Sequence, residues 1–72
     1  MKEKEFLNKL GQRIRDLRTE KSWTLCDLAA IINMDTSDLS KLELGYTNSK
    51  ILTLYKISQA FGITVSELTN IE

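Results

Sequence analysis

Apolar residues recur at intervals of three and four positions along most of this chain, and this spacing limits its fold more than any other feature. Such a stripe lies along one side of an α-helix, which has about 3.6 residues per turn. The first stripe, from about Glu3 to Lys21, consists of Phe6, Leu7, Leu10, Ile14 and Leu17. We therefore expect an amphipathic first helix with a charged outer face.

Two pairs of residues predict where later short helices begin. Thr24 stands three positions before Asp27, and Thr64 stands three positions before Glu67. In a capping box of this kind, each side chain satisfies a free backbone amide at the start of a helix. We expect a second helix from about Leu25 to Ile32 and a short fifth helix directly after Thr64.

Single residues predict the limits of the third and fourth helices. Asp35 is the expected N-cap of a helix over about residues 36–44, because its carboxylate can accept hydrogen bonds from the first-turn amides. Gly45 and Gly62 are expected to end the third and fourth helices, since glycine suits a left-handed conformation. The apolar positions of the fourth helix are Ile51, Leu54, Ile57, Ala60 and Phe61. Together the five segments predict one compact all-helical domain over residues 1–72.

Length and composition exclude several classes of protein. The chain has 72 residues, one cysteine and no histidine, so a disulfide within the chain is impossible and a classical zinc site lacks ligands. No apolar run approaches the about 20 residues of a membrane helix, and we expect a cytoplasmic protein. Since the chain lacks a nucleophile–base pair and a phosphate-binding glycine loop, we expect neither an enzyme nor a bound cofactor.

The charges are divided unevenly although they sum to zero. The first 21 positions hold seven basic residues against four acidic ones, whereas residues 22–72 hold three basic residues against six acidic ones. Nucleic-acid-binding domains usually have a basic excess or a basic patch. Only the first helix therefore has the charge that is typical of such a surface.

Several blocks of this chain resemble the Cro/C1-type, or XRE-type, helix-turn-helix family. The blocks are residues 10–18 (LGQRIRDLR), 23–24 (WT), 27–29 (DLA), 35–45 (DTSDLSKLELG) and 54–68 (LYKISQAFGITVSEL). The resemblance covers roughly residues 6–69, with the family's spacing between the blocks. It implies an all-α, five-helix, lambda-repressor-like domain with the helix-turn-helix at about residues 24–45. It also implies binding to double-stranded operator DNA, usually as a two-fold homodimer.

The resemblance implies roles for individual residues as well. The base-reading positions of the third helix hold Thr36, Ser37, Ser40 and Lys41. The usual phosphate-contacting positions hold Thr24, Tyr46, Thr47 and Asn48. Arg18 and Glu43 match a structural ion pair of the family. Apart from the family, Lys41 suits guanine edges, and Arg13 on the basic first helix is a candidate for a phosphate contact.

Three features depart from the family pattern. Leu25 stands where many members have glutamine, and its side chain cannot hydrogen-bond DNA. Ser22 replaces a glycine at the turn after the first helix, which predicts local backbone strain. The segment 35–45 has three acidic residues and one lysine, a balance that opposes contact with phosphates. Asp38 can accept a hydrogen bond from a cytosine amino group or can cap the helix.

These observations leave two functions open. The first is a sequence-specific DNA-binding transcriptional regulator with its third helix in the major groove. The alternative is a protein-interaction module on the same fold, an antitoxin-like protein or co-regulator with weak or no DNA binding. One candidate for the dimer surface is the apolar tail of Val65, Leu68 and Ile71. We expect Trp23 to pack in the core and Cys26 to be passive rather than a redox switch.

Overall fold

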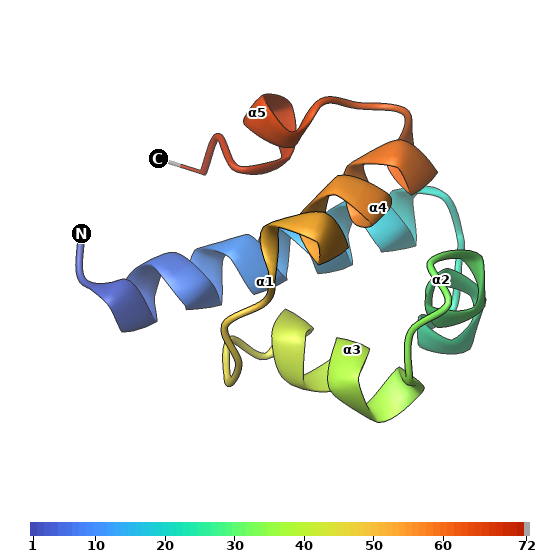
Figure 1. The fold of residues 1–72 in the computed structure, drawn as a ribbon, viewed down its shortest axis with the longest axis horizontal. Coiled ribbons are helices and arrows are strands. Elements are labelled where there is room, and N and C mark those ends of the chain that lie inside the picture. The colour runs from blue at the N-terminus through green and yellow to red at the C-terminus, as the bar shows by residue number, and fades with distance from the viewer. Residues whose placement is uncertain (72) are drawn as a thin grey trace.

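The computed structural model describes residues 1–71, which form five α-helices and no β-strand (Figure 1). The helices are α1 (Glu3–Glu20), α2 (Leu25–Ile31), α3 (Thr36–Glu43), α4 (Ile51–Phe61) and α5 (Val65–Leu68). The predicted all-helical fold is confirmed. Each of the first three helices also agrees with its predicted range to within one residue at either end.

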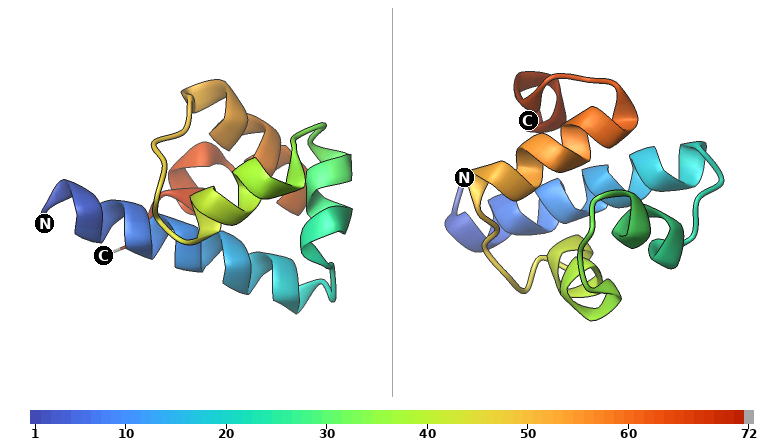
Figure 2. Two further views of the ribbon diagram at one scale, coloured as in Figure 1. Left: turned by 90° about the horizontal axis from the view of Figure 1, so that it is seen from below. Right: turned by 45° about the vertical axis from the view of Figure 1, so that its right-hand side comes forward.

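Helix α1 is the element around which the bundle is built. It contacts α3, α4 and α5, while α2 contacts α3 and α4 contacts α5. In Figure 1, α3 and α5 lie on opposite sides of α1. The left view of Figure 2, seen from the α3 side, shows α4 and α1 on opposite sides of α3. Helix α3 therefore lies at one edge of the molecule, between two longer helices.

A single apolar core joins the five helices. Each helix contributes at least one side chain with no exposed surface: Ile14, Leu28, Leu39, Ile57 and Leu68. Burial of such a side chain contributes about 1.5–3 kcal/mol to stability. Because Leu68 lies in the core of its own protomer, the prediction that it forms a dimer surface with Val65 and Ile71 is wrong. Val65 and Ile71 are themselves half-buried, and Ile71 packs against the same core.

Trp23 closes the turn between α1 and α2. Its ring stacks on that of Phe61 in α4, with the ring centroids 5.7 Å apart and the planes inclined at 20°. The Lys21 ammonium lies 5.5 Å from the centroid of the indole ring, within the range of a cation–π contact. The expected packing of Trp23 against the core is confirmed.

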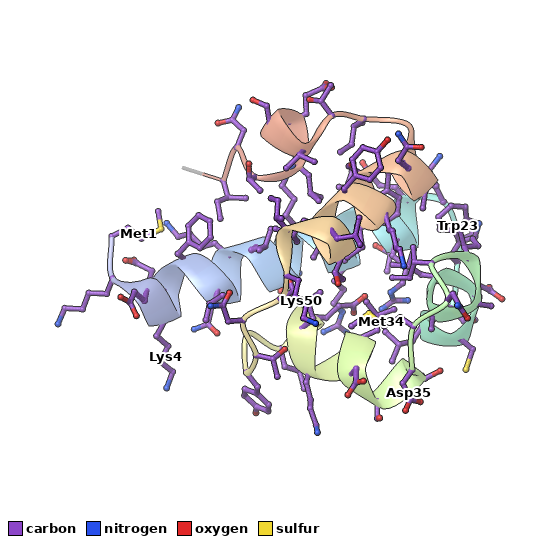
Figure 3. The ribbon with its side chains drawn as sticks, in the orientation of Figure 1. Met1, Lys4, Trp23, Met34, Asp35 and Lys50 are labelled. Atoms are coloured by element: carbon purple, nitrogen blue, oxygen red, sulfur yellow. The ribbon has the colours of Figure 1, made fainter. Side chains whose placement is uncertain are left out.

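Both predicted capping boxes are present. At the start of α2, the Asp27 amide donates to Thr24 Oγ1 over 3.1 Å, and the Thr24 amide donates to Asp27 Oδ2 over 2.8 Å. Thr64 and Glu67 make the same pair of bonds at the start of α5. Asp35 is the N-cap of α3, but its carboxylate makes no capping hydrogen bond, so that part of the prediction is wrong. Its side chain is exposed (Figure 3), and water can satisfy the first amides of α3.

The first four helices all end at a residue with a left-handed backbone. These residues and their φ angles are Ser22 (59°), Asn33 (54°), Gly45 (77°) and Gly62 (71°). After each of them the next amide bonds back to a carbonyl five residues earlier, as Met34 does to Ala29 over 2.8 Å. The roles of the two glycines are confirmed. The strain expected at Ser22 is also present, because a side chain is disfavoured at this φ.

Asn33 is a helix end that the sequence analysis missed. It follows Ile32, the C-cap of α2, and turns the chain toward α3. Asparagine is one of the few residues that tolerate the left-handed region, since its short amide can hydrogen-bond locally. The tight turn of the helix-turn-helix therefore depends on an asparagine rather than on a glycine.

Gly11 sets how closely α1 approaches α3. A Cβ atom at this position would overlap the backbone carbonyl oxygens of Leu42 and Glu43. The glycine therefore allows α1 to approach the last turn of α3 closely. A larger residue would push α3 outward from the bundle.

Candidate nucleic-acid interface

Helix α3 presents one ridge of side chains to solvent. Leu39 and Leu42 are buried beneath it and hold the helix against the core. Ser37, Lys41 and Leu44 occupy positions i, i+4 and i+7, so they lie along the same outer side of the helix, and all three are exposed. The rotation of α3 is thus fixed by its buried leucines, and the exposed ridge follows from it.

The four predicted base-reading residues separate into two pairs. Ser37 and Lys41 lie on the exposed ridge. Thr36 and Ser40 are half-buried. The hydroxyl of Thr36 lies 4.0 Å from the Sγ atom of Cys26, which places Thr36 on the flank of α3 that faces α2. The outward positions are therefore Ser37 and Lys41, with Thr36 and Ser40 beside them.

Leu44 is a ridge residue that the sequence analysis missed. It is the C-cap of α3, and 48% of its surface is exposed. Its spacing of seven from Ser37 is the signal that places it on the ridge. An apolar side chain on such a surface can contact the methyl group of a thymine.

The loop between α3 and α4 borders this ridge. The Tyr46 amide donates to the Lys41 carbonyl over 2.9 Å, so the loop begins tightly against the end of α3. The side chain of Tyr46 is exposed, as is that of Asn48, while Thr47 is half-buried. These three predicted phosphate-contacting residues therefore lie together, directly after the helix that carries the ridge.

A shallow hollow of about 330 Å³ lies between α3 and the start of α4. Its lining residues are Met34, Asp38, Thr47, Asn48, Ser49, Lys50 and Thr53. Asp38 therefore lies on the flank of α3 opposite to Thr36, in a hollow that Lys50 also lines. Lys50 was not among the predicted residues, and only the fold places it beside α3.

The start of α2 is the second place where a phosphate was expected. The capping box uses the Thr24 and Asp27 amides internally. The amides of Leu25 and Cys26 come before the first intrahelical hydrogen bond and have no acceptor in the helix. Thr24 is exposed and its hydroxyl can still donate, because the capping box uses that oxygen as an acceptor.

The structure gives Arg13 a role other than the predicted phosphate contact. Its Nε atom lies 3.2 Å from the Glu67 carbonyl oxygen and 3.1 Å from that of Leu68. Its Nη2 atom donates to the Glu67 carbonyl over 2.9 Å. These carbonyls belong to the end of α5, on the side of α1 away from α3 (Figure 1). Arg13 therefore caps α5, on the side of α1 away from the helix-turn-helix, and this position does not support the predicted phosphate contact.

Arg18 and Glu43 form the ion pair that the resemblance implied. Arg18 Nε donates to Glu43 Oε2 over 2.8 Å, and Nη2 donates to Oε1 over 3.1 Å. Arg18 Nη1 also donates to the Trp23 carbonyl over 2.9 Å. The hydrogen bond to Glu43 raises the pKa of Arg18 above its usual value. The pair is structural, because its side chains are only 12% and 6% exposed.

The described residues hold few features of other kinds of site. Within residues 1–71, no three His, Cys, Asp or Glu side chains are grouped so that they could hold a metal ion. No helix in this part of the chain combines the length and the apolar character that crossing a bilayer requires. Cys26 is exposed and unpaired.

Comparison with known proteins gives a consistent set of relatives. The family model described as helix-turn-helix matches residues 14–68. The HTH-type transcriptional regulator DdrOP3 of Deinococcus deserti is 40% identical over 60 residues, which cover 83% of this chain and 46% of that protein. The control protein C.MunI of a Mycoplasma species is 38% identical over 61 residues, covering 83% of this chain and 82% of that protein. This chain thus spans about half the length of DdrOP3 but most of C.MunI.

A solved structure is similar to this chain in both fold and sequence. The restriction-modification controller protein C.AhdI from Aeromonas hydrophila superposes with a TM-score of 0.83. It is 35% identical, and the match covers 86% of this chain and 94% of that one. The likeness therefore extends over nearly the whole of both chains.

Proposed function

Because this chain belongs to the helix-turn-helix family, we propose that it is a sequence-specific, DNA-binding transcriptional regulator whose helix α3 enters the major groove. One observation carries this proposal. Buried leucines hold α3 at an edge of the molecule, with Ser37 and Lys41 exposed along its outer ridge. The major groove of B-DNA is about 12 Å wide and admits one α-helix. The names of DdrOP3 and C.MunI support a regulatory role.

We assign the reading of bases to Lys41 and Ser37 first. A lysine ammonium can donate to the O6 and N7 atoms of guanine, and a serine hydroxyl can bond either type of base. Thr36 and Ser40 lie on the flank of the same helix and are the secondary readers in this proposal. The residues that read bases decide specificity, whereas contacts to phosphate position the protein.

We assign contacts with the phosphate backbone to the two ends of the helix-turn-helix formed by α2 and α3. Thr24 and the free backbone amides of Leu25 and Cys26 lie at the start of α2. Tyr46, Thr47 and Asn48 lie beyond the end of α3, where Lys50 adds a positive charge beside the net acidic α3. Such contacts release counterions, so binding must weaken as the salt concentration rises.

The proposed complex contains two copies of the chain. A two-fold dimer presents two α3 helices to successive major grooves, about 34 Å apart, and thereby doubles the contact area. This arrangement compensates for the small number of basic residues near a single α3. A palindromic site with that half-site spacing is the expected target.

The test is the selection of bound fragments from a random pool of DNA, followed by a salt titration on the selected site. Lys41→Ala should weaken binding about tenfold and relax the preference at one base position, since a good base contact contributes about 1–3 kcal/mol. Lys9→Ala removes the same charge from α1 near the C-terminal segment, beside Asn70 and Ile71, and should have little effect. Equal losses in both variants, or a pool that yields no consensus, would show that α3 does not read DNA.

A further inference from the structure

Helix α4 is apolar on both of its sides. Leu54, Ile57 and Phe61 are buried against the core on its inner side. On its outer side, Ile51, Leu52 and Tyr55 are 69%, 59% and 50% exposed. A surface helix of a small domain normally has a polar outer side, but Lys56 is the only charged residue within α4. The outer side of α4 thus has the composition of a covered surface.

The far end of the same surface is hollow. A shallow groove of about 460 Å³ lies between the end of α2 and the second half of α4. Its lining residues are Ile31, Ile32, Asn33, Lys56, Gln59 and Ala60. Ile31 in its wall is 52% exposed although it is a large apolar residue. One continuous helix therefore carries protruding apolar side chains at its start and a partly apolar groove at its end.

The protruding part and the groove match each other under a two-fold rotation. Leu52 and Ala60 are eight residues apart, which is about 12 Å along a helix. If two α4 helices pack antiparallel, the Leu52 end of each lies over the Ala60 end of the other. This is the self-complementary arrangement that a two-fold interface requires, in which residue i contacts j and j contacts i.

We propose that a second copy of this chain docks on the surface formed by Ile51, Leu52, Tyr55 and the groove beside Ile31. Leu52 of each copy enters the groove of its partner, and Tyr55, midway between Ile51 and Gln59, lies next to the two-fold axis. Lys56 and Gln59 form the polar rim. This inference deepens the proposed function, because it names the surface that joins the two DNA-binding copies.

The position of α4 is compatible with that function. Seen from the α3 side, α4 lies at one side of α3 and α1 at the other (Figure 2). A two-fold axis that is perpendicular to α4 and points toward the α3 edge makes the two α4 helices antiparallel. It also keeps both α3 helices on one edge of the dimer, with their ridges uncovered.

The size of the surface suits a modest homodimer. An aromatic side chain has about 150–250 Å² to bury and an aliphatic one somewhat less, so these four half-exposed apolar side chains offer on the order of 400 Å² per copy. A standard interface buries about 800 Å² per partner, of which the fully buried centre is the more apolar part. The apolar side chains would supply that centre, and the rim residues and the groove walls would supply the rest.

Sedimentation velocity without DNA tests the proposal. The wild-type chain should sediment as a dimer at tens of micromolar, and Leu52→Glu and Ile31→Glu should each weaken the dimer at least tenfold. Leu44→Glu is the matched control, because it changes a leucine of similar exposure, 48% against 59% for Leu52, at the end of α3. Circular dichroism must show that each variant stays folded. A wild-type chain that is monomeric at about 100 μM, or a Leu52→Glu variant that sediments as the wild type does, overturns the proposal.

Cross-linking tests the antiparallel register. In a Cys26→Ser background, Tyr55→Cys should form a disulfide-linked dimer on mild oxidation, whereas Gln12→Cys on the exposed side of α1 should not. Equal yields at both positions would contradict the register.

The two proposals fail separately. A dimer that selects no DNA sequence refutes the reading of bases by α3, and a chain that binds DNA only as a monomer refutes the α4 interface.

Discussion

Arg18 and Glu43 join the end of α1 to the end of α3 through two parallel hydrogen bonds of 2.8 and 3.1 Å. Arg18 lies about two turns along α1 from Gly11, whose missing side chain lets the same two helices approach. Both features act on the last turn of α3, directly before the exposed loop at Tyr46. The angle at which α3 leaves the bundle is thus set from its C-terminal end by α1.

The loss of this ion pair should destabilise the fold strongly. Glu43→Ala leaves the guanidinium of Arg18 without its partner at a nearly buried site, and we expect a loss of about 3 kcal/mol. Urea unfolding followed by circular dichroism measures it. Glu20→Ala, an exposed glutamate in the last turn of α1, should change stability by less than about 0.5 kcal/mol. Similar effects of the two changes would mean that the pair contributes nothing.

Gly11→Ala should destabilise the protein although alanine is the better helix former. Intrinsic propensity favours alanine by about 1 kcal/mol within a helix. Here the added Cβ meets backbone carbonyl oxygens of α3, which cannot move without shifting the helix. Gly62→Ala is the comparison. A Cβ atom at that site would meet no neighbouring atom, so only the left-handed φ makes alanine unfavourable there. In thermal unfolding, Gly11→Ala should have the lower Tm of the two.

Arg13→Gln separates a structural arginine from one that contacts phosphate. We expect a loss of about 1–2 kcal/mol in stability, because the carbonyls at the end of α5 lose a charged donor. The slope of DNA affinity against salt concentration should stay that of the wild type, since Arg13 neutralises no phosphate. If the slope of DNA affinity against salt concentration decreased by the contribution of one phosphate contact, the structural role would be contradicted.

Ser22→Gly should stabilise the protein by about 1 kcal/mol. The φ of 59° at this residue disfavours any side chain and suits glycine. Ser66→Gly provides the control with the opposite sign, because Ser66 lies within α5, where glycine weakens a helix. Denaturant titrations of both variants check the prediction, and a loss of stability in Ser22→Gly would refute it.

Acid should weaken the capping box of α5. The hydrogen bond from the Thr64 amide lowers the pKa of Glu67 below its ordinary value of 4.5. A carboxylate whose pKa is depressed in the folded state adds stability above the unfolded pKa, and this stability is lost as the pH falls through the folded pKa. Thermal unfolding between about pH 2 and 6 should therefore show a smaller acid dependence for Glu67→Gln than for the wild type. Identical profiles would contradict the linkage.

Much of this fold could be predicted because helix limits depend on neighbouring residues. Thr24 with Asp27, Thr64 with Glu67, and the two glycines after α3 and α4 act within one turn of the chain, and all of them behave as expected. The period of the apolar residues also identified Leu10 and Ile14 as core residues of α1, whereas in the stripe of α4 it included Ile51, which is 69% exposed. Asn33 was not predicted as the end of α2, because an asparagine adopts a left-handed backbone only sometimes.

What the sequence by itself determined is therefore the set of helices and the outward positions of Ser37 and Lys41, since these follow from local capping and from the period of the α-helix. The tertiary structure alone decided the partners of side chains that meet across the bundle. Arg13 turned to the carbonyls of α5, Leu68 entered the core, and Lys50 came to lie beside α3. The exposed apolar side of α4 was equally hidden in the sequence, because a helix with apolar residues all round does not reveal which side the core will take.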